Sequence, residues 1–277
     1  MKRAVLLALV LSAGGLAGCE TVDTTKPGVV GVDRNQRMLV SAEDFNKAAE
    51  QAYAQTIADA QKKGALDRDP AQVQRIKTIV GRLTPQTATF RPDAPGWKWE
   101  THVLSTSEIN AWCMPGGKIA VYTGLLDKIK PTDDELAAVI GHEMAHALRE
   151  HSREQASHQM AEQLALNVVG AVAHVPDVAV QLAPMVFDVT VNLPHSRTDE
   201  SEADRIGVEL AARAGYDPRA AIALWQKMQQ AGGSQPPKLL ATHPPTAERI
   251  KELQAVSEKL VPVYEQAKAS GSSSAGK

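Results

Sequence analysis

The sequence Gly141-His142-Glu143-Met144-Ala145-His146 places two histidines four residues apart, with a glutamate directly after the first of them. On a helix, residues four apart lie one turn apart on the same face, so both imidazoles can bind one metal ion. The glutamate then emerges beside the metal, within reach of a metal-bound water. The stretch therefore predicts a zinc site built on His142 and His146.

The residues around this motif predict a helix over 132–151. Thr132 and Glu135 form a capping box, and an apolar stripe follows at helical spacing: Leu136, Val139, Ile140, Ala147 and Leu148. Gly141 lies inside this helix, where glycine costs about 1 kcal/mol relative to alanine. We interpret it as a sign of close packing beneath the metal site. The alternative is a surface helix whose histidines and glutamate are incidental.

A catalytic zinc site needs a third protein ligand and one open position. His151 and His158 lack the spacing of a third histidine ligand, so we look to the acidic stretch 199–204. There Glu200 and Asp204 share one helix face; Glu200 can complete the metal site, and Asp204 can accept the free N–H of a ligating imidazole. The alternative is a solvated helix start, where acidic residues are favoured, and spacing alone does not decide.

The remaining pattern indicates an α+β protein that is mainly helical. Further helices are predicted over 41–62, 70–83, 199–214, 218–230 and from Pro244 onward, and strands over 97–104, 110–114 and 118–123. Pro115-Gly116-Gly117 joins the last two strands as a hairpin. The strand 118–122 is either an edge strand that pairs with an extended substrate or an ordinary core strand. The apolar runs within 160–193 are too short to span a bilayer and predict buried or cleft-covering helices.

The two ends of the chain are expected to lie outside the folded domain. A basic start, an apolar run and Leu16-Ala17-Gly18-Cys19 resemble a bacterial lipoprotein signal, so we expect a signal peptide over 1–18, lipidation of Cys19 and a flexible tether over 19–37. A plain secretory signal with an incidental cysteine is the alternative. Glu20 favours outer-membrane sorting. The domain is expected over 38–262 and a disordered tail over 263–277. Cys113, then without a partner, is interpreted as a buried small residue.

Four segments in order resemble one family. They are 110–117, the HExxH helix, the Glu200-to-Asp204 stretch, and Thr242-His243-Pro244-Pro245 leading to Glu248-Arg249-Ile250. Together they resemble the gluzincin metallopeptidases that include HtpX-type and CAAX prenyl proteases, most of all periplasmic lipoprotein members, over most of 38–262. The resemblance implies a zincin-like domain with a small sheet or hairpin beside the HExxH helix. It also implies one zinc ion on His142, His146 and Glu200, with Glu143 as catalytic acid/base. Asp204 matches a family aspartate sometimes given as a proton donor, although we favour an orienting role.

His243 is the candidate donor to the oxyanion that develops during peptide hydrolysis, with Arg197 and Arg205 as lesser candidates. Alternatively, His243 binds the zinc as a fourth ligand and holds the enzyme latent, or it is a structural turn residue before two prolines. His195 is interpreted as structural or at the surface, without a partner.

The predicted function is a zinc-dependent metalloendopeptidase of the bacterial cell envelope that acts in protein quality control. Its expected partners are misfolded or flexible envelope proteins and, through the lipid, a membrane. Nucleic acid is not expected because the formal net charge is −2. The oligomeric state is not predicted. The alternative is a latent protease that acts mainly as a chaperone-like assembly factor.

Overall fold

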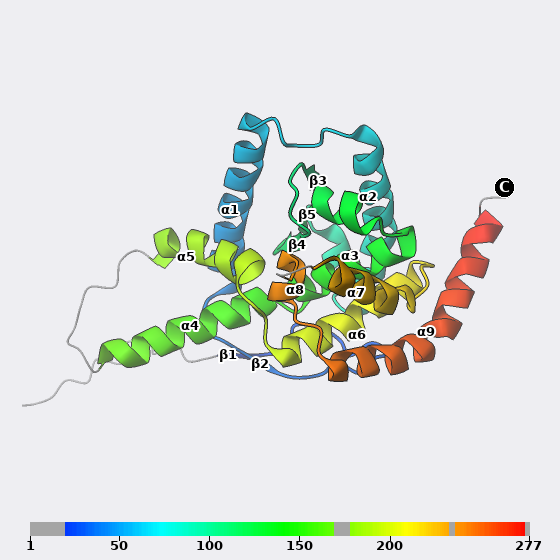
Figure 1. Ribbon diagram of the computed structural model, residues 1–277. Coiled ribbons are helices and arrows are strands. Elements are labelled where there is room, and N and C mark those ends of the chain that lie inside the picture. Colours follow the sequence, from blue (N-terminus) through cyan, green and yellow to red (C-terminus); the bar gives the residue numbers. More distant parts are fainter. Residues whose placement is uncertain (1–19, 169–177, 233–235, 275–277) are drawn as a thin grey trace, which may run out of the picture.

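The computed structural model describes residues 20–168, 178–232 and 236–274. Helices surround a small three-stranded sheet, and a two-stranded sheet lies near the N-terminal end of the described residues, so the chain is a mainly helical α+β protein, as the sequence predicts (Figure 1). The predicted signal peptide and Cys19 lie outside the described residues. Among the residues that the structure describes, no helix has the length and apolar character to cross a membrane.

Two helices form the centre of the domain and contact each other along their length: α3 (Asp133–Leu148) and α6 (Arg197–Arg213). The predicted capping box of Thr132 and Glu135 begins α3, and Ser196 with Asp199 forms a second capping box at α6. The two helices meet at glycines. A Cβ added to Gly141 would lie 2.7 Å from the carbonyl oxygen of Gly207. The close packing predicted beneath the HExxH motif is therefore present, and α6 is the element that provides it.

The sheet has three strands in the order β3-β5-β4, bounded as β3 (Glu100–Leu104), β4 (Ala111–Met114) and β5 (Lys118–Tyr122). The predicted hairpin joins β4 to β5, with Gly116 and Gly117 at φ of 77° and 82°. Because β5 pairs with β3 on one side and β4 on the other, the strand at 118–122 is central and not an edge. The strand of this sheet that contacts α3 is β4.

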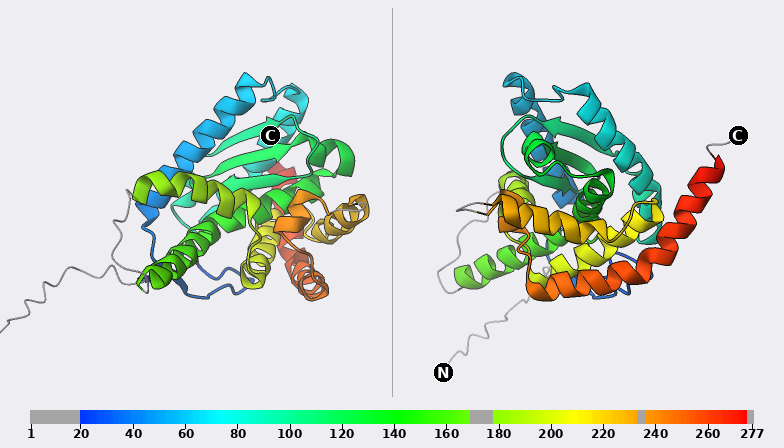
Figure 2. Two further views of the ribbon diagram at one scale, coloured as in Figure 1. Left: turned by 60° about the vertical axis from the view of Figure 1, so that its left-hand side comes forward. Right: turned by 45° about the vertical axis from the view of Figure 1, so that its right-hand side comes forward.

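The other helical elements lie around this centre, and the left view of Figure 2 shows the sheet between them. They are α1 (Ala42–Lys62), α2 (Pro70–Leu83), η1 (Thr84–Thr89), η2 (Ala94–Gly96), η3 (Leu125–Ile129), α4 (His151–Val168), α5 (Val178–Phe187), η4 (Asp188–Asn192), α7 (Ala220–Ala231), α8 (Lys238–Thr242) and α9 (Ala247–Ser274). The apolar region near 182–189 packs on α1 through Leu182, Val186 and Val189. The helix predicted to run to His151 ends earlier, because Glu150 takes a left-handed φ of 54° between α3 and α4.

Residues 20–38 form a strap that packs on the domain, which corrects the flexible tether expected over 19–37. Its ends pair as β1 (Glu20–Val22) and β2 (Gln36–Met38) beneath α4 and α6 in Figure 1. Val30 and Val32 are buried in the core, and the N–H groups of Val29 and Val30 donate to the Glu209 carboxylate. The sequence looked like a linker because it is polar, yet its polar groups pair with buried charges of the domain.

The expected disordered tail over 263–277 is also corrected as far as residue 274, and its last three residues lie outside the described part of the chain. Helix α9 continues to Ser274, and Val263 and Tyr264 pack against the main hydrophobic core. This part of the sequence looked disordered because its last residues are rich in serine and glycine. The apolar residues before them nevertheless bind the helix to the domain.

Candidate metal centre

Three elements bring four side chains with metal-binding atoms to one point. His142 and His146 come from α3, Glu200 from the first turn of α6, and His243 from the residue after α8. One potential ligand atom from each lies within 4.8 Å of the others. The Nε2 atoms of His142 and His146 are 3.1 Å apart, and the Glu200 carboxylate lies 3.5 Å from His146 Nε2. Imidazole nitrogens with one carboxylate are a donor set that suits zinc, so these residues fit one zinc ion.

His243 lies on the remaining side of this cluster. Its Nδ1 is 2.7 Å from Oε1 of Glu200 and 3.3 Å from Nε2 of His142, while its Nε2 is 3.5 Å from Oε1 of Glu143. Burial lowers the pKa of His243, but the charges of Glu200 and Glu143 outweigh it and raise the pKa to about 9. This position fits a fourth ligand better than a free turn residue.

Both glutamates of the centre are buried, yet their pKa values move in opposite directions. Burial raises the pKa of Glu143, and the nearby charges of His243 and His142 only partly offset that. Burial also tends to raise the pKa of Glu200. The charge of His243 and the hydrogen bonds of His146 and His243 outweigh this effect and hold the pKa of Glu200 well below the ordinary value. Glu200 is thus held ionised as a ligand requires, while Glu143 is shifted toward a pKa suited to proton transfer.

Arg249, which had no role in the sequence-based prediction, joins Asp204 to Glu200. Asp204 Oδ1 lies 3.1 Å from His142 Nδ1, although off the line of that N–H. The Arg249 guanidinium donates to both oxygens of Asp204 at 2.8 and 2.9 Å, and its Nη1 lies 2.7 Å from Oε2 of Glu200. One buried cation thereby fixes both acidic residues of α6. The sequence feature that could have indicated this role of Arg249 was its position in the segment that follows His243.

We expect Arg249→Leu to lower the free energy of unfolding of the zinc-free protein by about 3–5 kcal/mol, because two buried carboxylates lose their shared cation. Urea denaturation of the zinc-free wild type and variant measures this difference in the free energy of unfolding. Arg249→Lys is the matched variant and should recover part of the loss. A loss below about 1 kcal/mol for the leucine variant would mean that the carboxylates do not depend on this cation.

His195, for which the sequence indicated no partner, is buried beside the metal-binding residues and is therefore not at the surface. Its ring stacks on His146 with 4.1 Å between centroids, and its backbone N–H donates to the carbonyl of Thr242, next to His243. Burial is the largest cause, and the charge of His243 the next, of a pKa of His195 well below the ordinary value. No sequence signal marks this residue, because it lies outside a helix and at no ligand spacing.

The two arginines considered as oxyanion donors lie elsewhere. Arg197 is exposed, and Arg205 contacts the strap carbonyls of Val30 and Gly31.

Cys113 is buried, and burial raises the pKa of its thiol well above the ordinary value, which fits its interpretation as a small buried residue.

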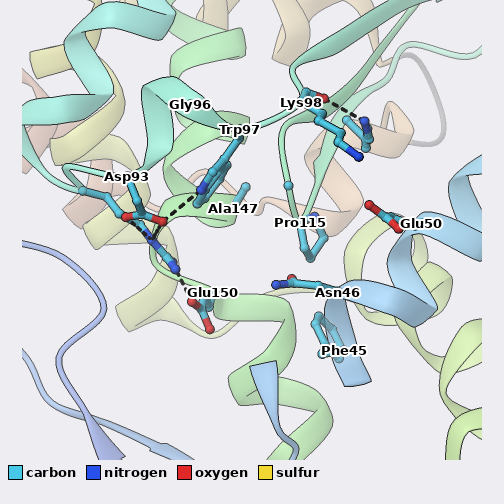
Figure 3. Close-up of a pocket in the computed structure, with 13 residues that line it drawn as sticks. Phe45, Asn46, Glu50, Asp93, Gly96, Trp97, Lys98, Pro115, Ala147 and Glu150 are labelled. Atoms are coloured by element: carbon cyan, nitrogen blue, oxygen red, sulfur yellow. Dashed lines mark hydrogen bonds and ion pairs between the residues drawn. The ribbon is translucent and has the colours of Figure 1, made fainter. Parts of the chain in front are cut away.

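The centre is enclosed in this conformation. The four metal-binding side chains and that of Glu143 are each at most 4% exposed. A cavity of about 320 Å³ lies nearby, between α1, the 91–98 loop and the hairpin turn, and Figure 3 shows Phe45, Trp97 and Pro115 at its wall. None of the four metal-binding side chains lines this cavity. A peptide therefore needs a movement of the protein to reach the centre.

Comparison with known proteins agrees with this geometry. The model of peptidase family M48 matches residues 70–257. The mitochondrial metalloendopeptidase OMA1 of Bos taurus is 32% identical over 83% of this chain and 45% of its own length. The metalloprotease YcaL of Escherichia coli is 26% identical over 90% of this chain and 95% of its own, and the beta-barrel assembly-enhancing protease of Yersinia pestis is 26% identical over 70% and 40%.

The chain spans less than half the length of the OMA1 relatives from Bos taurus, Arabidopsis thaliana and Schizosaccharomyces pombe. The family match, by contrast, covers more than half of this chain and includes the HExxH helix, Glu200 and His243. This chain belongs to peptidase family M48.

Proposed function

We propose that this protein is a zinc-dependent metalloendopeptidase of the bacterial cell envelope. The observation that carries the proposal is that His142 and His146, on the helix that also carries Glu143, meet Glu200 and His243 with ligand atoms within 4.8 Å of one another. Bound zinc supplies a Lewis acid for the scissile carbonyl and lowers the pKa of the attacking water.

The residues of the chain supply the rest of the reaction. His142, His146 and Glu200 hold the metal, and Asp204 orients the His142 ring from its far side. Glu143 removes a proton from the attacking water and later delivers it to the leaving amine. The raised pKa of Glu143 supports this second role, since a carboxyl that holds a proton more readily is a better acid.

Removal of the metal is the direct test of this activity. We expect a chelator to abolish digestion of an unfolded protein such as reduced casein, and stoichiometric zinc to restore it. Magnesium serves as the control, because it prefers oxygen ligands in an octahedral arrangement and should not restore the activity. Digestion that persists in the zinc-free protein would contradict the proposal.

We further propose that His243 is a fourth zinc ligand that keeps the enzyme latent. Its Nδ1 lies close to the ligand atoms of Glu200 and His142, so His243 would take the fourth position that a catalytic zinc site otherwise leaves open. The enclosed centre supports this role, because the resting conformation leaves no space for a peptide. In this view His243 withdraws when the cleft opens.

In the latent wild type, the open form is expected to make up about 10% of the molecules or less, and in His243→Ala it becomes the main form. We therefore expect the substitution to increase turnover about tenfold or more. Initial rates of peptide cleavage measure it. His102→Ala is the control, since His102 pairs with Asp67 and Glu100 away from the centre. A fall in turnover would instead make His243 the oxyanion donor.

For location and substrate, we propose a lipid anchor on Cys19 at the outer membrane, and misfolded or flexible envelope proteins as substrates. A relative named as a beta-barrel assembly-enhancing protease and the motif Leu16-Ala17-Gly18-Cys19 support this. Because the strap begins its pairing at Glu20, such a lipid would hold the domain directly at the membrane surface.

A further inference from the structure

The ring of His146 has two nitrogens, and each faces a different partner. Nε2 faces the metal centre, 3.1 Å from Nε2 of His142. Nδ1 lies 2.9 Å from Nδ1 of His151, a fully buried histidine at the start of α4. Nε2 of His151 lies 3.1 Å from Oε2 of Glu202 on α6. A continuous row of polar contacts thus leads from the metal centre through His151 to Glu202.

Only one arrangement of protons satisfies this row once the metal is bound. A nitrogen that binds zinc carries no proton, so the proton of the His146 ring is on Nδ1. That N–H donates to His151 Nδ1, which must then be the bare, accepting nitrogen. The proton of His151 is therefore on Nε2 and is donated to the Glu202 carboxylate.

Glu202 is fixed at the far end by two arginines. Arg34 Nε donates to its Oε1 at 2.7 Å, and Arg149 Nε donates to its Oε2 at 3.0 Å. Arg34 lies on the strap, and its backbone carbonyl also accepts from Nη2 of Arg149. His151, Asp199 and Glu202 are close enough to hold a second metal ion, but these arginines already neutralise the carboxylates. Because the arginines already supply the positive charge that a cation would bring, this group is poorly suited to a second metal ion.

We propose that His151 is a positioning residue that holds His146 in the rotation and tautomer needed to bind zinc. Each histidine ligand would then be held at Nδ1 by an acid of α6, His142 by Asp204 directly and His146 by Glu202 through His151. The strap completes the second of these supports through Arg34. The proposal rests on the zinc site of the proposed function, since it assigns His146 as a ligand.

Two substitutions of His151 separate positioning from packing. In His151→Asn, the amide oxygen takes the place of Nδ1 and can still accept from His146. In His151→Gln, the amide nitrogen takes the place of Nε2 and can still donate to Glu202, but the acceptor toward His146 is lost. Both variants remove the ring and retain a polar side chain, so a purely structural role would affect them similarly.

The readout is zinc affinity, measured by competition with a chromophoric chelator. We expect His151→Gln to weaken zinc binding about 10–100-fold and His151→Asn to weaken it much less. Thermal unfolding of both zinc-free variants controls for folding. Equal loss in the two variants, or no loss in the glutamine variant, would overturn the proposal. Wild-type protein that binds zinc but cleaves nothing would contradict the proposed function and leave this comparison intact.

A second measurement reads the proton positions in the wild-type protein and uses the His151→Asn variant only to assign the His151 signals. Long-range ¹H–¹⁵N spectra of the zinc-loaded protein report which ring nitrogen of each histidine is protonated. We expect the His151 ring, assigned by the signals that are missing in the His151→Asn protein, to have a bare Nδ1 and a protonated Nε2. Protonation of His151 at Nδ1 would overturn the proposal, because that nitrogen could not accept from His146.

Discussion

Replacing Glu143 with glutamine is expected to lower kcat/KM for an unfolded protein substrate by about 10²–10⁴-fold, because the amide cannot take a proton from the attacking water. Glu143 is no ligand in the proposed site, so the zinc content should stay at one ion per chain. Cleavage of reduced casein by the zinc-loaded proteins measures the change.

The same variant separates the protease from the chaperone-like alternative. Glu143→Gln leaves the metal-binding residues in place and keeps the size of the side chain, so the fold should be unaffected. If this variant rescues an envelope phenotype as well as the wild type does, proteolysis is not the biological role. Equal cleavage by the two proteins would contradict the catalytic assignment itself.

Gly207→Ala is expected to destabilise the protein although it leaves every metal ligand untouched. Its Cβ would lie 2.6 Å from the backbone nitrogen of His142 and 2.8 Å from its Cα, and backbone atoms cannot turn aside. Overpacking of this kind should lower the free energy of unfolding by about 2 kcal/mol or more, even after the gain in helix propensity. Because α6 carries Glu200 and Asp204, zinc affinity should fall too.

Gly81→Ala is the matched control for this prediction. Gly81 also lies inside a helix, α2, but a Cβ there would meet nothing within 4 Å. The substitution should raise the free energy of unfolding by up to about 1 kcal/mol. Urea denaturation of both variants is the measurement, and a destabilised Gly81→Ala or an unaffected Gly207→Ala would contradict the packing argument.

The sequence was informative where a local pattern has one physical meaning. The HExxH spacing, the Thr132 capping box and the hairpin at 115–117 each specify a local geometry, and the structure has all three. Gly141 indicated close packing correctly, although it could not name α6 as the neighbour. The structure also brings Glu200 to the HExxH motif, as the family resemblance implied, together with His243, the candidate oxyanion donor or fourth ligand.

What the sequence missed depends on contacts between distant residues. The strap looked like a linker because the partners of its backbone groups, Arg149 and Glu209, are more than 100 positions away in the sequence. Arg249 and His195 carry no spacing signal, and the tertiary fold alone places them at the metal. The order of the sheet likewise follows from the parallel pairing of β3 with β5, which no local pattern indicates.

The central claim is that one zinc ion binds between His142, His146 and Glu200, with His243 as the fourth ligand. Anomalous diffraction at the zinc absorption edge, from crystals of the zinc-loaded protein, tests it most directly. The account predicts one anomalous peak per chain among these four side chains. A peak at His151, Asp199 and Glu202 instead, or no peak within bonding distance of His146, would contradict it.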